Sequence, residues 1–272
     1  MSTHKRGVLF LFALLNALLL SPLTAQVYIL GYPKSGNNLF CYTLSNIPNE
    51  TVLLAKHSGQ SEVWFSPVSL DPSAPNSPPN RLHGLSFAHN PVALGLSKAN
   101  QNRDYLIVLV RDCREAIIRL AVQTATARDA FTPEKALSLI QSLQPLHIMK
   151  NCYQVQGENY INVLRCYENW NPKTRIIVYY EDLLTYFEQT IADCLMQLGV
   201  QECAFDEFMA HKEERIKDCR DNYRYGKTMS GGDLTYHQKT WLRPDLSKRM
   251  DLLMQNKFPY YWNQYLARYA TP

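Results

Sequence analysis

Short runs of apolar, β-branched and aromatic residues alternate along this chain with longer segments of helical pattern. The runs that predict strands are residues 27–30, 85–88, 105–110 and 175–179. The third run, Tyr-Leu-Ile-Val-Leu-Val, is apolar throughout, which is typical of a strand buried on both faces of a parallel sheet. Helices are predicted at residues 37–44, 112–127, 133–150, 157–170 and 183–198, and within residues 236–269. Strands that alternate with helices predict an α/β fold in which helices flank a parallel central sheet.

Two segments carry neither pattern, and we predict that they are loops. Residues 66–80 contain five prolines among Asp, Asn and Ser residues, a composition typical of an irregular surface loop. We interpret this segment as an excursion within a domain, not as a boundary. Residues 222–233 form a second, polar loop. A chain of 272 residues lies near the upper end of single-domain size, so we expect one domain over residues 26–272.

The N-terminus has the layout of a secretory signal peptide. Residues 1–6 are positively charged, residues 7–20 form a predominantly apolar run, and Ser-Pro-Leu-Thr-Ala follows at residues 21–25. A membrane-spanning helix needs about 20 apolar residues, more than this run supplies. A cleaved leader over residues 1–25 predicts a secreted protein or one in the lumen of the secretory pathway. The alternatives are an uncleaved anchor, with membrane association through residues 7–20, and a buried N-terminal helix of a cytosolic protein.

Charge and cysteine spacing limit the classes of partner. Two of the 28 basic residues, Lys5 and Arg6, lie in the leader, which leaves 26 basic against 24 acidic residues and a net charge of +2. This balance argues against a nucleic-acid-binding protein. The seven cysteines show no spacing typical of a metal site, so we expect no metal. Cys194 and Cys203 could pair in an oxidising lumen, and buried free thiols are the alternative.

The segment Gly-Tyr-Pro-Lys-Ser-Gly-Asn-Asn, residues 31–38, joins the first predicted strand to the first predicted helix. A glycine-containing loop in this position directs several backbone N–H groups and the positive end of the helix dipole to one point. Such a point binds phosphate or sulfate. Lys34 precedes Ser35 and Gly36, so the order differs from the Walker form GxxxxGK[ST] of nucleotide triphosphatases.

The order Pro-Lys-Ser-Gly instead resembles the 5′-phosphosulfate-binding loop of the sulfotransferase family, commonly Tyr-Pro-Lys-Ser-Gly-Thr-Thr-Trp. Residues 32–36 match this loop directly, and Asn37 fits a frequent variant. Asn38 and Leu39 depart from its Thr and Trp. The resemblance implies that the loop binds the donor 3′-phosphoadenosine 5′-phosphosulfate (PAPS) as a co-substrate. The residues implied are Lys34, Ser35, Gly36, Asn37 and Asn38.

A second resemblance begins where the run 105–110 ends. Val-Arg-Asp-Cys-Arg-Glu-Ala, residues 110–116, is similar to the family's 3′-phosphate segment, in which an Arg at the end of a strand opens a helix. The resemblance implies that Arg111 binds the 3′-phosphate of the donor through charge-assisted hydrogen bonds. The alternative is that Arg111 only caps the edge of the sheet. The family usually has a Ser eight residues later, where this chain has Arg119, which either binds the phosphate more strongly or occupies its site.

Two later segments add weaker resemblances. Tyr-Glu-Asp-Leu at residues 180–183 matches a block of the family, and we expect Glu181 and Asp182 to cap a helix and fix local structure rather than to perform chemistry. Residues 225–233 resemble a late Arg-Lys-Gly loop of the family, which implies that Lys227 contacts the 3′-phosphate.

Catalysis in the family depends on a His that follows a short strand and acts as general base. His89 follows the predicted strand 85–88 and lies 55 residues beyond Lys34. The resemblance implies that His89 activates the acceptor. It also implies that Lys34 neutralises charge on the oxygen that leaves with the nucleotide. Phe87 stands where the family has a Lys, so His83 as the base and a structural role for His89 are the alternatives.

The resemblance therefore implies a sulfotransferase with a P-loop-like nucleotide-binding fold. It would transfer a sulfuryl group from PAPS to a hydroxyl or amine acceptor, a glycan or a small molecule, by in-line displacement. Acceptor pockets in such folds are built from loops like residues 57–83, whose shape does not follow from composition. One alternative is a degenerate relative that binds a nucleotide or glycan without transfer, prompted by Asn38, Phe87, Arg119 and Leu234. Another is an ATP-dependent phosphotransferase, which the loop order disfavours.

Overall fold

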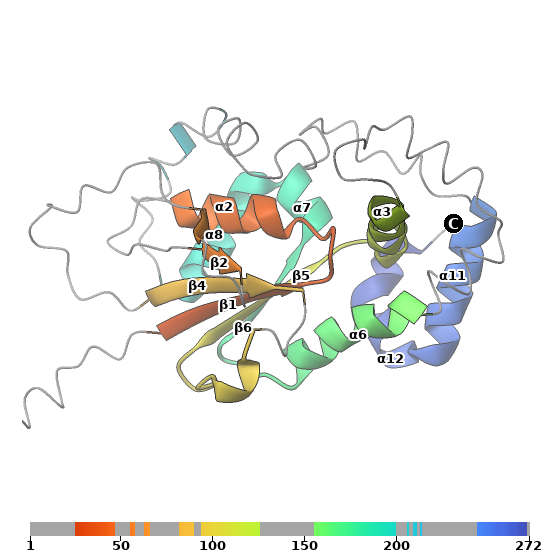
Figure 1. Ribbon diagram of the computed structural model, residues 1–272, viewed down its shortest axis with the longest axis horizontal. Coiled ribbons are helices and arrows are strands. Elements are labelled where there is room, and N and C mark those ends of the chain that lie inside the picture. Colours follow the sequence, from red (N-terminus) through yellow and green to blue (C-terminus); the bar gives the residue numbers. More distant parts are fainter. Residues whose placement is uncertain are drawn as a thin grey trace, which may run out of the picture.

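A six-stranded sheet in the order β3-β2-β4-β1-β5-β6 forms the centre of the computed structural model (Figure 1). Its strands are β1 (Ala25–Gly31), β2 (Ala55–His57), β3 (Val63–Phe65), β4 (Leu82–Ala88), β5 (Tyr105–Val110) and β6 (Arg175–Tyr179). The residues that the structure describes are 25–46, 55–57, 63–65, 82–89, 94–125, 155–199, 206, 209–210, 213 and 244–270. The four predicted strands correspond to β1, β4, β5 and β6 and are confirmed.

The sheet is parallel except at one edge. β1 pairs in parallel with β4 and β5, β2 pairs in parallel with β4, and β5 pairs in parallel with β6. β2 and β3 are antiparallel. Only five residues separate β2 from β3. A parallel crossover needs roughly a dozen residues, so a connection this short returns the chain in the opposite direction. The predicted parallel central sheet is confirmed, and the antiparallel edge strand is an addition to it.

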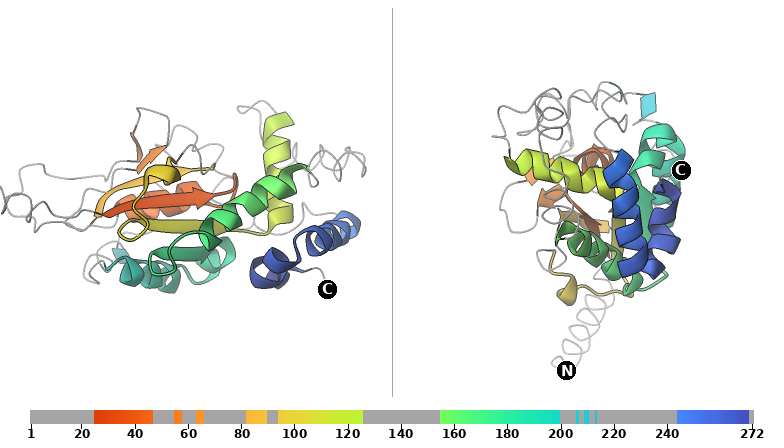
Figure 2. Two further views of the ribbon diagram at one scale, coloured as in Figure 1. Left: turned by 90° about the horizontal axis from the view of Figure 1, so that it is seen from below. Right: turned by 90° about the vertical axis from the view of Figure 1, so that its right-hand side faces the viewer.

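Helices cover both faces of the sheet, as Figures 1 and 2 show. The described helices are α2 (Asn37–Asn46), α3 (Cys113–Ala125), α6 (Val155–Glu168), α7 (Tyr180–Thr185), α8 (Phe187–Leu198), α11 (Pro244–Lys257) and α12 (Pro259–Tyr261). Three shorter helical segments are η1 (Leu96–Lys98), η7 (Trp262–Leu266) and η8 (Ala267–Tyr269). α2, α7 and α8 pack on one face, and α6 packs on the other together with α3 and the C-terminal helices. α3 begins two residues after β5 ends, which places its first turn at the carboxyl end of the strand.

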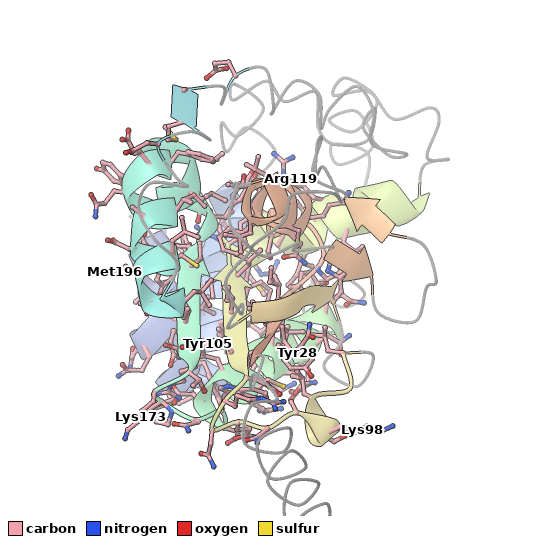
Figure 3. The ribbon with its side chains drawn as sticks, turned by 90° about the vertical axis from the view of Figure 1, so that its left-hand side faces the viewer. Tyr28, Lys98, Tyr105, Arg119, Lys173 and Met196 are labelled. Carbon is pink, nitrogen blue, oxygen red and sulfur yellow. The ribbon has the colours of Figure 1, made fainter. Side chains whose placement is uncertain are left out.

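Strand β5 is buried on both faces, as its apolar sequence predicts. Leu106, Val108 and Val110 pack with α3 and α6, whereas Ile107 and Leu109 pack with α2 and α8. Each of these side chains is at most 1% exposed. Burial of an aliphatic side chain stabilises the folded state by about 1.5–3 kcal/mol. The side chains of β5 therefore stabilise the hydrophobic cores on both faces of the sheet. Side chains on the outer surfaces of the helices and loops, such as Met196 and Lys173, point away from the fold (Figure 3).

The predicted helix 183–198 is two helices, α7 and α8. The chain leaves helical geometry at Tyr186, whose backbone has φ −126° and ψ 49°. α7 begins directly after β6, so residues 180–182 are helical as well, and the break lets α8 turn back along the sheet. α8 ends at Gly199, whose φ of 71° is the left-handed conformation that glycine adopts readily at helix ends.

Several predictions concern residues outside the described part of the chain. They are the leader, the loops 66–80 and 222–233, the helix 133–150, and the role of Lys227. Among the described residues, no helix combines the length and the apolar character needed to cross a membrane. Cys194 is a free thiol in the core, and burial raises its pKa to about 12. The structure thus favours the free-thiol alternative over a bond from Cys194 to Cys203.

Candidate functional site

The predicted anion-binding loop joins β1 to α2 through a tight turn. Ser35 N donates to Tyr32 O at 3.1 Å, and Phe40 N donates to Gly36 O at 3.1 Å. Lys34 has φ 72° and is the one residue other than glycine in the described part of the chain with positive φ, while Gly36 has φ 88°. A residue other than glycine in this conformation stores about 1–3 kcal/mol of strain, which is typical of ligand-binding loops. Left-handed residues turn successive N–H groups toward one side, an arrangement that binds anions.

Gly36 is required by a close approach as well as by its φ. A Cβ at this position would lie 2.2 Å from Cδ2 of Tyr180, the first residue of α7. A charge lies over the same ring, because the guanidinium carbon of Arg111 is 4.2 Å from the centroid of Tyr180. Tyr180 therefore links the loop to the end of β5. Sequence reasoning treated it only as part of a motif and missed this role.

His89 lies at the carboxyl end of β4 and contacts the loop from the neighbouring strand. Its Nδ1 is 2.8 Å from Gly31 O and 2.8 Å from Asn37 Nδ2. Asn37 Nδ2 also donates to Gly31 O at 3.0 Å. His89 is exposed, whereas Asn37 is 3% exposed, so a buried amide orients an accessible imidazole. The structure thus brings two predicted site residues together.

Arg111 leaves the end of β5 and reaches the loop. Its Nη1 donates to Lys34 O at 2.8 Å, and its Nη2 donates to Glu115 Oε1 at 2.7 Å. Its backbone is held by Tyr160, whose hydroxyl accepts from Arg111 N at 3.0 Å and donates to Arg111 O. The side chain is only 4% exposed. The Arg111 side chain therefore bonds to the loop that contains Lys34.

Arg119 lies on the same buried face of α3. Its Nε and Nη2 lie 2.7 and 2.6 Å from Glu115 Oε1, so Glu115 bridges Arg119 and Arg111. Burial lowers the pKa of Arg119, and the charge of Arg111 acts in the same direction, whereas Glu115 opposes both. We call Arg111, Glu115 and Arg119 the bridged cluster. Sequence reasoning missed Glu115, although its spacing of four residues from each arginine on a helix is a signal for such pairs.

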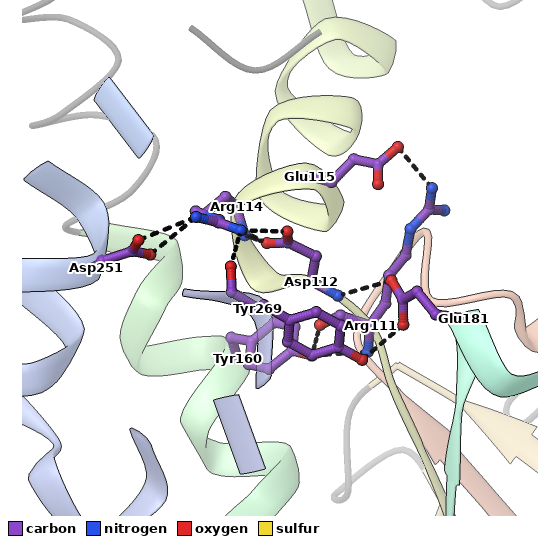
Figure 4. Close-up of polar contacts among 8 residues, drawn as sticks. All are labelled: Arg111, Asp112, Arg114, Glu115, Tyr160, Glu181, Asp251 and Tyr269. Carbon is purple, nitrogen blue, oxygen red and sulfur yellow. Dashed lines mark hydrogen bonds and ion pairs between the residues drawn. The ribbon is translucent and has the colours of Figure 1, made fainter. Parts of the chain in front are cut away.

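A second set of buried charges fixes the segment behind Arg111 (Figure 4). Arg114 donates to both oxygens of Asp112, at 2.9 and 2.6 Å, to Asp251 of α11 at 3.0 Å, and to the carbonyl of Tyr269. We call Asp112, Arg114 and Asp251 the anchor cluster. Because its members come from the start of α3 and from α11, it ties the end of β5 to the C-terminal helices.

Glu181 also links the end of β5 to the C-terminal helices. It accepts from Asp112 N at 3.2 Å and from the Tyr269 hydroxyl at 2.6 Å. Burial raises the pKa of Glu181, and the hydrogen bond from Tyr269 opposes that shift. Asp182 forms two bonds with Arg268 nearer the surface. Both acidic residues thus fix local structure, as we expect from their place after β6, but they do so through contacts with distant segments and not by capping α7, whose N-terminus has no side-chain cap hydrogen bond.

Unpartnered buried polar atoms gather in this site. Four buried side-chain atoms have no hydrogen-bond partner in the described part of the chain, and three of them belong to Ser35, Asn37 and Arg111. Nearly all buried polar groups in proteins are paired, so such a concentration needs an explanation. Ser35 Oγ and Arg111 Nε are donors, which fit the phosphate and sulfate oxygens of a donor nucleotide. Asn38 lies in the first turn of α2, and Lys227 is not among the described residues.

The sheet order and the strand–loop–helix unit formed by β1, the loop and α2 define an open α/β fold. The chain matches no protein-family model and no curated protein sequence. Among solved structures it is similar to the mouse sulfotransferase SULT7A1 complexed with PAP, with a TM-score of 0.55 and 14% identity over 90% of this chain and 89% of that chain. The chain therefore has the sulfotransferase fold, and the predicted fold is confirmed.

Two further solved structures were found at lower similarity. Retinol dehydratase in complex with androsterone and inactive cofactor PAP has a TM-score of 0.49 and 13% identity, over 85% of this chain and 80% of that chain. The sulfotransferase domain from the curacin biosynthetic pathway has a TM-score of 0.40 and 17% identity, over 68% of this chain and 77% of that chain.

Proposed function

We propose that this protein is a sulfotransferase that transfers a sulfuryl group from PAPS to a hydroxyl or amine acceptor. One observation carries the proposal. The residues expected to bind or activate the reactants come from three separate segments, and hydrogen bonds join them into one network. Gly31 and Asn37 contact His89 on one side of the loop, and Lys34 O accepts from Arg111 on the other. These groups lie at the carboxyl ends of β4, β1 and β5, the edge where parallel α/β sheets bind ligands.

The donor would be bound at both ends by this network. The loop N–H groups, Lys34 and Ser35 and the N-terminus of α2 suit the 5′-phosphosulfate. Arg111 and Arg119 suit the 3′-phosphate, with Lys227 as a further ligand. When bound, the nucleotide supplies the sulfuryl group. Lys34 then neutralises charge that develops on the oxygen remaining with the nucleotide, which leaves as adenosine 3′,5′-bisphosphate.

His89 is the proposed general base. Nδ1 lies 2.8 Å from both Gly31 O and Asn37 Nδ2, and it can donate to the first or accept from the second but cannot do both. The proposed tautomer is the one in which Nδ1–H donates to Gly31 O, because it leaves the lone pair on Nε2, where the imidazole can accept a proton. Nε2 takes the acceptor proton as the bond between the acceptor atom and sulfur forms and the bond between sulfur and the nucleotide oxygen breaks. General base catalysis of this kind contributes about 10²- to 10⁴-fold in rate.

The acceptor class and the cellular location extend the proposal. A glycan or a small molecule with a hydroxyl or amine group is the expected acceptor. We further propose that residues 1–25 act as a leader that directs the enzyme to the lumen of the secretory pathway or outside the cell, with membrane anchoring as the alternative. PAPS is made in the cytosol, so a luminal enzyme requires a compartment that imports the donor.

The test is transfer itself. The full chain is incubated with PAPS carrying a ³⁵S label and with pooled hydroxyl and amine acceptors, beside His89→Ala and His83→Ala. We expect labelled product from the wild type, a loss of about 10²- to 10⁴-fold in His89→Ala, and little change in His83→Ala. Selective binding of adenosine 3′,5′-bisphosphate with neither transfer nor hydrolysis of PAPS would leave a nucleotide-binding protein and overturn the enzymatic proposal.

A further inference from the structure

The backbone at Arg111 is held by side chains from distant segments. Arg111 and Asp112 lie between β5 and α3 and belong to neither element. The Tyr160 hydroxyl accepts from Arg111 N at 3.0 Å and donates to Arg111 O, and Glu181 Oε1 accepts from Asp112 N at 3.2 Å. Figure 4 shows these side chains around the segment. The place of the Arg111 side chain in the site therefore depends on α6 and α7.

Glu181 is itself oriented by Tyr269 of η8. The Tyr269 hydroxyl donates to Glu181 Oε2 at 2.6 Å, so the two oxygens of this carboxylate bond to different segments. One oxygen bonds to the N–H next to Arg111, and the other bonds to η8. Hydrogen bonds to a carboxylate are stronger than those between neutral groups, and a carboxylate held at both oxygens keeps a fixed orientation. Tyr269 is buried, so its hydroxyl contributes to this orientation without exposure to water.

Two further contacts dock η8 on the end of β6. Arg268 donates to both oxygens of Asp182, at 3.0 and 2.5 Å. Its guanidinium carbon lies 4.2 Å from the centroid of the Tyr179 ring. Tyr179 is the last residue of β6 and pairs with Val110, which directly precedes Arg111. η8 therefore docks beside the point where Arg111 leaves the sheet.

These contacts link the docking of η8 to the position of Arg111. If η8 separates, Glu181 loses the bond from Tyr269, and the N–H of Asp112 loses an acceptor of fixed orientation. A binding residue that occupies its productive position for only a fraction of the time binds its ligand more weakly by that fraction. Linkage is reciprocal, so a phosphate that binds to Arg111 must favour the docked state by the same factor.

We propose that Tyr269 is a positioning residue of the donor site, which holds the backbone at Arg111 through Glu181, so that docking of η8 and binding of the donor's 3′-phosphate strengthen each other. The inference rests on the proposed function, because it concerns the donor site proposed there. It gives a role in donor affinity to η8, a segment that lies outside all the family motifs of the sequence.

The first test compares Tyr269→Phe with Tyr260→Phe in the full chain. Each change removes a hydroxyl that bonds to a glutamate. The partner of Tyr260 is Glu168, which bonds to Arg175 at the start of β6, the edge of the sheet opposite to the site. Calorimetry gives the affinities for adenosine 3′,5′-bisphosphate and for adenosine 5′-monophosphate, which lacks the 3′-phosphate.

Tyr269→Phe should bind the bisphosphate about tenfold more weakly, a factor typical of coupling between sites. Its affinity for the monophosphate should not change, because this nucleotide has no 3′-phosphate for Arg111 to bind. In the transfer assay Tyr269→Phe should raise the KM for PAPS and leave kcat unchanged. Tyr260→Phe should keep both affinities. Wild-type affinity for the bisphosphate in Tyr269→Phe overturns the proposal, and so does an equal loss of affinity for the two nucleotides.

Hydrogen exchange of the wild type tests the same coupling from the other side and needs no variant. The amide of Ala270, which donates to Ala267 O at 3.0 Å, reports the order of η8. The two nucleotides are used at concentrations that raise the melting temperature equally, so that their effects on global unfolding match. The bisphosphate should slow exchange at η8 about tenfold more than the monophosphate does. Equal exchange with the two nucleotides contradicts the proposal, even where Tyr269→Phe fails to fold.

The outcomes separate this inference from the proposed function. If the wild type binds the bisphosphate and transfers sulfate, but Tyr269→Phe binds the bisphosphate equally well, only the inference fails. If the wild type does not bind the bisphosphate, the proposed function fails and the inference fails with it.

Discussion

The two buried charge clusters at the start of α3 differ in how their arginines and carboxylates pair. In the anchor cluster, Arg114 is bonded to two carboxylates and a carbonyl, and its pKa is raised because the bonds and charges of Asp112 and Asp251 outweigh burial. In the bridged cluster, two arginines share Glu115, and the pKa of Arg119 is lowered by burial. The anchor cluster thus joins two segments of the fold, whereas the bridged cluster joins two arginines that we propose bind the donor.

The largest effect is expected from Arg114→Met. Asp112 and Asp251 would then be buried without their shared partner, which typically costs about 3–5 kcal/mol. Urea unfolding followed by circular dichroism measures the loss. If the free energy of unfolding falls by less than about 1 kcal/mol, the anchor cluster does not hold α3 against α11. The contrast between the two clusters would then be wrong.

Gly36→Ala tests the contact between the loop and the bridged cluster. A methyl group would lie 2.2 Å from the Tyr180 ring, on which Arg111 stacks, and φ is 88°. Adverse φ alone costs about 1–2 kcal/mol. We expect this loss of stability together with a loss of bisphosphate binding of at least tenfold in calorimetry.

Gly199→Ala is the matched control for this change. Its φ is 71°, but a Cβ there meets no atom within 4 Å. It should lose a similar amount of stability from φ and no nucleotide affinity. Equal loss of affinity in the two variants would mean that strain in general, and not the Tyr180 contact, weakens binding.

Arg119→Met should separate binding from stability. Glu115 keeps its pair with Arg111 and so is not left as an uncompensated buried charge, and the free energy of unfolding should change by less than about 1 kcal/mol. Bisphosphate affinity should fall about tenfold, which corresponds to about 1.4 kcal/mol. A large loss of stability with full affinity would assign Arg119 to the fold and not to the donor site.

The smallest expected effect concerns pH. Burial raises the pKa of Glu181 above its ordinary value of 4.5, so the folded state binds this proton more tightly than the unfolded state. The resulting stability is fully present below pH 4.5 and is lost as pH rises through the folded pKa. Glu181→Gln should flatten this fall in urea-unfolding free energies measured from pH 4 upward. An unaltered pH profile in Glu181→Gln would assign the dependence to another group.

Much of the fold could be predicted because four of its strands contain short runs of apolar residues. β5 lies between Asp104 and Arg111, and both ends were predicted to the residue. β2 and β3 were missed, since three residues are too few to show a period. The break at Tyr186 was missed because residues on both sides of it fit one helical pattern.

Some parts of the candidate site could likewise be predicted from the sequence, and others could not. The loop and Arg111 carry local motifs, so their positions follow from a strand, a turn and a helix. The bonds from Arg114 to Asp251 and from Tyr269 to Glu181 join residues 137 and 88 positions apart, and no local pattern indicates such pairs. Long-range partners become visible only when the chain is folded.

The central claim, that this network is the donor site of a sulfotransferase, is tested most directly by calorimetry of the full chain with adenosine 3′,5′-bisphosphate and with ATP and magnesium. Lys34→Ala removes the loop ammonium, and Lys98→Ala is its control, because Lys98 points away from the fold on η1 (Figure 3). We predict selective micromolar binding of the bisphosphate that is lost in Lys34→Ala and kept in Lys98→Ala. Absence of bisphosphate binding, or a preference for ATP, would contradict the account.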